Sequence, residues 1–349
     1  MTAPTKVDLG LGHVKIILPD FPTVSAIGAE YGPAAGLSAL REAVAQWETV
    51  QATEICITTG ASLGMAATLA ALPRPCSVLC PRPYYPAYPK LAAFLGMDVL
   101  FYDLEAQRKW LPDPAKIERL LRHDTRAILW NFPSNPTGSL PPVSLVEEIS
   151  ALVVRQNLLV VSDEVYADFT YEDDPSMDAR ADFGRERIIH LRSFSKIFGI
   201  PGERVGYIIA EPERIQALSS THWTLGMSPP ATAQLMALSC LRNGPDDRIR
   251  SLREALAKCR REAAAILRSC PNAIVSEPAA GIFLWIEVRD SPLDSRALSR
   301  ACAEAGGVIV TPGAAFGVNN PVFLRASFGL ELEQVQQGFQ RLANFLRTL

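Results

Sequence analysis

The sequence predicts an α/β fold with a large, doubly wound and mostly parallel seven-stranded sheet domain, together with a smaller α+β domain. Two observations support this prediction. Seven short runs of β-branched or apolar residues alternate with longer helical patterns between residues 54 and 210. Runs that are apolar at nearly every position indicate strands buried on both faces, which is typical of parallel sheets covered by helices. After about residue 235 this alternation ends, so a second domain is expected there.

The expected strands follow one another along the first two thirds of the chain. They are EICIT (54–58), SVLC (77–80), MDVLF (97–101), RAILW (126–130), LLVVS (158–162), RIIHL (187–191) and GYIIA (206–210). Between them, apolar residues recur at the spacing of an amphipathic helix. The clearest cases are Leu37, Leu40, Val44 and Trp47, and then Leu145, Ile149 and Val153.

The C-terminal third has a different pattern. A long amphipathic helix contains Ile249, Leu252 and Leu256, and it is followed by the strand GIFLWIEV (281–288) and the helix SRALSRACAEAG (295–306). A final helix carries Val335, Phe339, Leu342 and Leu346. We therefore expect residues 32–235 to form the large domain and residues 236–349 to belong to the small one.

The composition is typical of a globular protein that acts on small molecules. The chain has 349 residues, of which 48% are hydrophobic, and a net charge of −3. Its basic residues form no block, which argues against a nucleic-acid surface. The apolar run from Ala61 to Leu72 is broken by Pro73 and is too short to span a bilayer, and the first residues contain no signal-like apolar segment. We expect a soluble, cytoplasmic protein that does not bind membranes.

Cysteine and histidine usage argues against a metal site. The seven cysteines form no CxxC pair and lie mostly in apolar segments, and the four histidines are scattered. Buried free thiols and no bound metal are therefore expected.

One lysine lies among hydroxyl groups directly after an expected strand. Ser193 precedes Lys196 by three residues, and Arg204 follows it by eight. A lysine amine can form a Schiff base with the aldehyde of pyridoxal phosphate, while a hydroxyl and a guanidinium bind the phosphate. A solvated lysine in a serine-rich loop is the simpler alternative.

Polar residues also follow two other expected strands. At Gly60, Ala61 and Ser62 a strand gives way to a helix, whose free N–H groups can bind phosphate, although an ordinary helix cap explains the same pattern. Asp163 directly follows the run LLVVS, and a carboxylate at the end of a buried strand is costly unless it is paired. A protonated pyridine nitrogen would be a suitable partner, and the alternative is a helix N-cap.

Three further segments carry candidate site residues. Tyr84 and Tyr85 follow a strand at the edge where ligands bind, and either ring could stack on a cofactor or anchor the loop. The segment NFPSNPTG (131–138) contains Asn135 and reads equally as a Pro-Gly turn. Arg325 lies in an apolar strand, where a substrate carboxylate or an internal glutamate could pair with it.

Together, S-x-S-K, NFPSNPTG, SDEVY (162–166), TPGAAFG (311–317) and FLRAS (323–327) resemble, in order and separation, the motifs of the class I/II aminotransferases, which are fold-type I pyridoxal-phosphate enzymes. The resemblance implies a Schiff base on Lys196, a phosphate site at Gly60, Ala61, Ser62, Ser193 and Arg204, and ring stacking by Tyr85. It further implies that Asp163 pairs with the pyridine nitrogen, that Asn135 and Tyr166 hydrogen-bond the cofactor phenolate oxygen, and that Arg325 and Asn135 bind substrate.

The resemblance has further implications near the N-terminus. Tyr31 matches a tyrosine that reaches the phosphate of the neighbouring subunit, which implies a homodimer with shared active sites, and Gly12 matches a glycine that lies over the substrate. Residues 1–31 would then join the small domain. Only 18 residues separate Gly12 from Tyr31, which is shorter than in many members of the family and indicates a substrate entrance that is either more open or differently lined.

The leading functional hypothesis is an aminotransferase that moves the amino group of an α-amino acid to a 2-oxo acid. The alternative on the same scaffold is a lyase, cyclase or oxidase of a specialised amino acid, because the fate of the substrate carbanion depends on groups that sequence does not reveal. A third hypothesis is a non-catalytic ligand-sensing domain. An intact set of Lys196, Asp163 and Arg325 argues against it.

Overall fold

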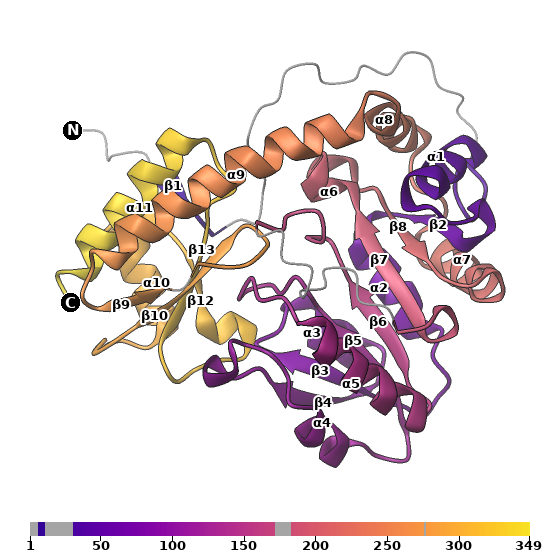
Figure 1. The fold of residues 1–349 in the computed structure, drawn as a ribbon, viewed down its shortest axis with the longest axis horizontal. Coiled ribbons are helices and arrows are strands. Elements are labelled where there is room, and N and C mark those ends of the chain that lie inside the picture. Colours follow the sequence, from indigo (N-terminus) through magenta and orange to yellow (C-terminus); the bar gives the residue numbers. More distant parts are fainter. Residues whose placement is uncertain (1–5, 11–30, 172–182, 276) are drawn as a thin grey trace.

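The computed structural model describes residues 6–10, 31–171, 183–275 and 277–349. Its main feature is a seven-stranded sheet in the order β2-β8-β7-β6-β5-β3-β4 (Figure 1). Strand β8 is antiparallel to both neighbours, and the other pairs are parallel. The strands are β2 (Ile55–Thr58), β3 (Ser77–Arg82), β4 (Asp98–Asp103), β5 (Thr125–Trp130), β6 (Leu159–Asp163), β7 (Ile188–Ser193) and β8 (Gly206–Ile209). All seven expected strands and the mostly parallel sheet are confirmed.

Helices cover both faces of this sheet because its strands are apolar on both sides. Val78 and Val161 pack into one cluster with α2 (Gly60–Ala70), α3 (Ala87–Phe94) and α7 (Pro212–Gly226). Their sequence neighbours Leu79 and Val160 pack on the opposite face with α4 (Pro114–Leu120) and α5 (Val143–Arg155). Alternate residues of one strand therefore serve two cores. β4 is only partly buried, because it is the last strand in the order of this sheet.

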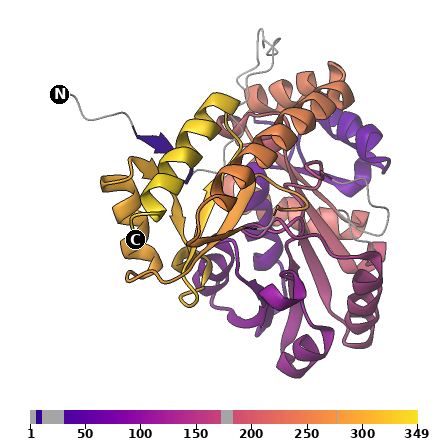
Figure 2. The same ribbon diagram turned by 60° about the vertical axis from the view of Figure 1, so that its left-hand side comes forward.

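The C-terminal part contains a second sheet of four strands in the order β12-β13-β10-β9. These strands are β9 (Ala273–Val275), β10 (Phe283–Val288), β12 (Thr311–Pro312) and β13 (Phe323–Ser327). The long helix α9 (Pro245–Arg268) crosses the molecule and packs against α11 (Leu332–Leu346), as both views show (Figures 1 and 2). The helix α10 (Ser295–Glu304) completes this part, so the expected C-terminal helices and strand are present.

The N-terminal strand lies with the C-terminal elements. Strand β1 (Val7–Asp8) pairs in parallel with β11 (Val308–Ile309) beside α11 (Figure 2). The remaining helices and 3-10 turns are α1 (Ser38–Glu48), α6 (Phe194–Ile197), α8 (Ala231–Arg242), η1 (Ala52–Glu54), η2 (Ala106–Arg108), η3 (Arg185–Arg187), η4 (Pro201–Glu203) and η5 (Gly313–Phe316).

The structure bears on the expectations for the cysteines and for membrane-spanning helices. All seven cysteines are free and buried, which confirms that expectation. Among the helices that the structure describes, none is both long and apolar enough to cross a membrane.

Candidate active site

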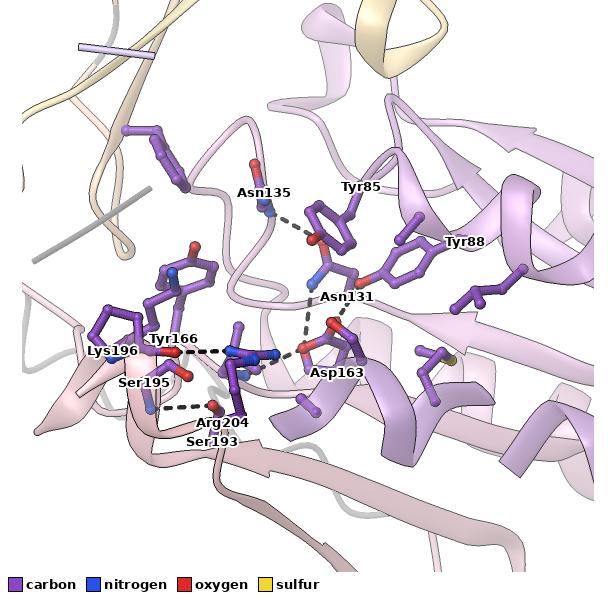
Figure 3. A pocket seen from close by; sticks show the side chains of 18 of the residues that line it. Tyr85, Tyr88, Asn131, Asn135, Asp163, Tyr166, Ser193, Ser195, Lys196 and Arg204 are labelled. Carbon is purple, nitrogen blue, oxygen red and sulfur yellow. Dashed lines mark hydrogen bonds between the residues drawn. The ribbon is translucent and has the colours of Figure 1, made fainter. Parts of the chain in front are cut away.

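A cavity of about 450 Å³ opens where the carboxyl ends of β5, β6 and β7 meet the second sheet. Both sheets contribute side chains to the cavity. Figure 3 labels those that come from the large sheet and the segments next to it. Ten of the residues singled out in the sequence line it: Ala61, Ser62, Tyr85, Asn135, Asp163, Tyr166, Ser193, Lys196, Arg204 and Arg325. Residues from distant parts of the chain thus share one site, because parallel strands end at the same edge of a sheet.

Lys196 lies on the short helix α6, which starts directly after β7. Ser193 ends the strand, and its hydroxyl accepts a hydrogen bond of 3.1 Å from the Ser195 N–H. Burial lowers the pKa of the Lys196 amine to about 8, and the guanidinium groups of Arg325 and Arg204 act in the same direction. The Asp163 carboxylate opposes them only in part. The amine is therefore neutral in a substantial fraction of molecules near pH 8.

The start of α2 faces the guanidinium of Arg204. Gly60 has φ +69°, and a Cβ atom at this position would lie 2.6 Å from Arg204 Nη2. The alternative of an ordinary side-chain cap is not seen, because Thr59 precedes the helix without a side-chain capping bond. Instead, the Thr59 N–H donates to His222 Nε2 at 3.0 Å. Arg204, Ala61 and the hydroxyls of Ser62, Ser193 and Ser195 line this end of the cavity, which suits an anion.

Asp163 ends β6 and is 8% exposed. Tyr88 donates a hydrogen bond of 2.6 Å to its Oδ2, and the Val165 N–H donates to Oδ1 at 3.4 Å. Burial raises the pKa of Asp163, while the Tyr88 hydrogen bond lowers it. The described residues after β6 form turns, so Asp163 does not cap a helix there.

Two asparagines of the segment 131–138 connect the neighbouring strands. Asn131 accepts a hydrogen bond of 3.0 Å from the Asn135 N–H and donates one of 3.3 Å to the Asp163 carbonyl oxygen. The side-chain Oδ1 of Asn135 accepts from Arg325 Nη1 at 2.9 Å. Asn135 itself lines the cavity.

Arg325 comes from β13 of the second sheet and is 7% exposed. Its guanidinium lies over two rings, 3.9 Å from the centroid of Phe283 and 4.9 Å from that of Phe316. Nη2 donates to the Gly10 carbonyl oxygen at 2.7 Å, whereas Nε is buried and has no hydrogen-bond partner within the described part of the chain. Among the described residues no carboxylate forms a salt bridge with Arg325. The alternative that Arg325 pairs with an internal glutamate is therefore wrong for that part of the chain. Burial lowers its pKa to about 10.

The aromatic candidates are separated by the fold. Tyr85 lines the cavity and packs edge-on against Tyr88, with ring centroids 5.5 Å apart. Tyr84 points elsewhere and packs against Phe101 at 5.3 Å. Tyr166 lines the cavity next to Phe283, with centroids 5.7 Å apart, and burial raises its pKa.

Two site residues were predicted near the N-terminus. One lies outside this cavity, and the other is not among the residues that the structure describes. Tyr31 is 77% exposed, packs edge-on against Trp223 and does not line the cavity of its own chain. Gly12 lies outside the described residues.

Sequence reasoning missed several lining residues. Tyr88, Asn131, Ser195 and Phe283 were not among the predicted site residues, although all four line the cavity. Tyr88 carried a readable signal, because it belongs to the same aromatic segment PYYPAY (83–88) as Tyr85, at the start of α3. Asn131 follows the end of β5 at the same edge where Asp163 ends β6. Phe283 carried no such signal, since it lies in an ordinary apolar strand.

Comparisons with known proteins agree with this arrangement. A family model described as "Aminotransferase class I and II" matches residues 26–342. An LL-diaminopimelate aminotransferase from Dehalococcoides mccartyi is 28% identical over 94% of this chain and 89% of its own length. The putative aminotransferase YugH of Bacillus subtilis is 27% identical over 97% of this chain and 91% of its own length. A solved structure of a Thermus thermophilus aspartate aminotransferase mutant covers 98% of this chain and 92% of its own, with a TM-score of 0.87 and 25% identity.

Proposed function

This chain belongs to the class I and II aminotransferase family, and from that membership we propose that Lys196 holds the cofactor and moves the proton, while Arg325 binds the substrate α-carboxylate. The protein is a pyridoxal-phosphate-dependent aminotransferase, which transfers the amino group of an α-amino acid to a 2-oxo acid. The observation that carries the residue assignment is the convergence of Lys196, Asp163, Arg204 and Arg325 on one cavity.

The residues of the cavity fit pyridoxal phosphate. Its phosphate would be held by Ala61, Ser62, Ser193 and Arg204, where a glycine at position 60 leaves room for the guanidinium. Its ring would be held by Asp163 at the nitrogen, by Tyr85 at the face, and by Asn135 and Tyr166 at the phenolate oxygen. When bound, the cofactor supplies an aldehyde that condenses with amines and a ring that withdraws electrons from the substrate α-carbon.

Lys196 has the properties of a base that works near neutral pH. Its amine titrates at about 8, so the neutral form can accept a proton at Nζ from the substrate α-carbon. The protonated form can return that proton in the second part of the transfer. A lysine with an ordinary pKa of about 10.4 would hold its proton too tightly for this task.

Arg325 presents donors that suit a carboxylate. Its guanidinium is kept in place by Phe283, Phe316 and Asn135, and its buried Nε has no partner among the described residues. A planar carboxylate could accept hydrogen bonds from such a guanidinium in bidentate geometry.

We also propose that the protein is a cytoplasmic homodimer with two domains. Seven reduced, buried cysteines suit a reducing compartment. Tyr31 is exposed and outside its own cavity, which suits a residue that reaches the phosphate of the partner subunit. We place the large domain at 32–235, a boundary inside α8, and assign 1–31 and 236–349 to the small domain around the four-stranded sheet.

The test of the proposed function uses the purified protein loaded with pyridoxal phosphate. We expect a visible absorbance band that disappears when a suitable amino acid from a panel is added and returns with a 2-oxo acid, with one new oxo acid formed per amino group transferred. Lys196→Ala should lack the band and lose more than about a hundredfold in turnover, whereas the exposed Lys90→Ala on α3 serves as the control. Release of ammonia, or an unchanged Lys196→Ala, would contradict the proposal.

A further inference from the structure

The Asp163 carboxylate is held by a side chain from outside the strand ends, the hydroxyl of Tyr88 on α3. Tyr88 is 1% exposed, and its Oη lies 2.6 Å from Asp163 Oδ2 (Figure 3). We propose that Tyr88 is a positioning residue that keeps Asp163 ionised and directed at the cofactor ring. This inference rests on the proposed function, in which Asp163 pairs with the ring nitrogen.

Asp163 needs such support because its surroundings favour the neutral carboxyl. Burial raises its pKa, and a protonated carboxyl could not accept a hydrogen bond from a ring nitrogen as strongly as a carboxylate. Two charged groups act on Asp163 in opposite directions, since Glu164 raises its pKa and Lys196 lowers it. Glu164 itself pairs with His190 at 2.7 Å and accepts from Ser162, so these groups are engaged with each other.

Hydrogen bonds from the protein are therefore the main influence that keeps Asp163 charged. The Val165 N–H is 3.4 Å from Oδ1, a long contact, whereas the Tyr88 hydroxyl makes a short one. Hydrogen bonds to a charged acceptor are stronger than those between neutral groups. Of these two donors, Tyr88 thus makes the stronger contact with the carboxylate.

Tyr88 is well suited to act as a fixed donor. Burial and the neighbouring Asp163 raise its pKa well above the ordinary value, so the hydroxyl keeps its proton throughout the working pH range. Its ring packs edge-on against Tyr85, and its N–H donates to the Tyr85 carbonyl oxygen at 3.0 Å. Tyr88 therefore links Tyr85, which is proposed to stack on the cofactor ring, with Asp163, which is proposed to bind the nitrogen of that ring.

The test measures binding of pyridoxal phosphate to the cofactor-free protein by fluorescence titration from pH 5 to 9. Tyr88→Phe keeps the ring and removes the hydroxyl, and Tyr88→Leu replaces it if the first variant is insoluble. Tyr102→Phe is the matched control, because this tyrosine is also 1% exposed and also donates to a buried acceptor, the Leu129 carbonyl oxygen at 2.7 Å, outside the cavity. We expect Tyr88→Phe to weaken binding about tenfold, with the acid-side loss of affinity starting at higher pH than in wild type.

A double-mutant cycle with Asp163→Asn separates positioning from packing. In the Asp163→Asn background, removal of the Tyr88 hydroxyl should change the dissociation constant by less than about twofold, because no carboxylate remains to be held. Equal effects of Tyr88→Phe and Tyr102→Phe, or a loss of about tenfold on adding Tyr88→Phe to Asp163→Asn, would overturn the inference alone. A wild-type protein that fails to bind pyridoxal phosphate, or an Asp163→Asn variant that binds it as wild type does, would instead overturn the proposed function.

Discussion

At the scale of single residues, burial and the charges of Arg325 and Arg204 determine the chemistry of Lys196. Its amine titrates at about 8, because burial, Arg325 and Arg204 all disfavour the charged form. Only the neutral amine attacks an aldehyde. We therefore expect the rate at which the cofactor-free protein takes up pyridoxal phosphate to rise about tenfold per pH unit below 8 and to level off above it. Stopped-flow absorbance checks this.

A comparison variant tests the electrostatic cause. Arg325→Met removes the second-largest contribution to the low pKa of Lys196. The pH at which the rate of pyridoxal-phosphate uptake levels off should therefore be higher in this variant. A wild-type midpoint at about pH 10 would show that Lys196 behaves as an ordinary lysine.

Arg325→Ala tests the carboxylate site. The loss of a charge-assisted bidentate contact costs about 2–3 kcal/mol, so KM for the amino acid should rise by about 30-fold to 140-fold. Arg260→Ala is the control, since Arg260 is also 7% exposed and lies over a ring, Tyr171, but does not line the cavity. It should lower the melting temperature and leave KM unchanged. The same KM in Arg325→Ala and wild type would place the carboxylate site elsewhere.

At the scale of secondary-structure elements, the first turn of α2 combines a left-handed residue with close approach of Arg204. Gly60→Ala should cost about 1–2 kcal/mol of stability because of the positive φ. It should also weaken pyridoxal-phosphate binding about tenfold, because the new Cβ displaces the guanidinium from the phosphate site. Thermal unfolding and cofactor titration measure the two effects separately.

Gly96→Ala provides the matched control for this helix start. Gly96 has φ +67°, almost the value of Gly60, and a Cβ there would meet nothing within 4 Å. The two variants should therefore lose similar stability, while only Gly60→Ala loses cofactor affinity. Equal affinities would show that Arg204 has no part in holding the phosphate.

At the scale of the whole molecule, the proposed homodimer makes a testable claim about an exposed residue. Tyr31→Ala should weaken pyridoxal-phosphate binding about tenfold, although Tyr31 lies outside the cavity of its own chain, because its hydroxyl would act in the partner subunit. Phe94→Ala, which removes another exposed ring, should leave the affinity unchanged. Sedimentation must show a dimer. A monomeric holoenzyme, or equal affinity in both variants, would contradict the proposal.

The seven strands, the main helices and the family could be predicted from the sequence, since they depend on local apolar patterns and on short motifs. The strand EICIT, for example, differs by one residue from β2 (Ile55–Thr58). Lys196, Asp163 and Arg325 could be singled out because each carries a charge or amine beside or within an apolar strand, which is costly without a partner.

Tertiary structure alone decided which side chains touch. The hydrogen bond from Tyr88 to Asp163 and the placement of Arg325 over Phe283 depend on pairings between residues far apart in the chain, 75 positions in the case of Tyr88 and Asp163. No local pattern encodes such contacts. They arise because the sheet order brings the ends of distant strands to one edge, and because the second sheet then packs against that edge.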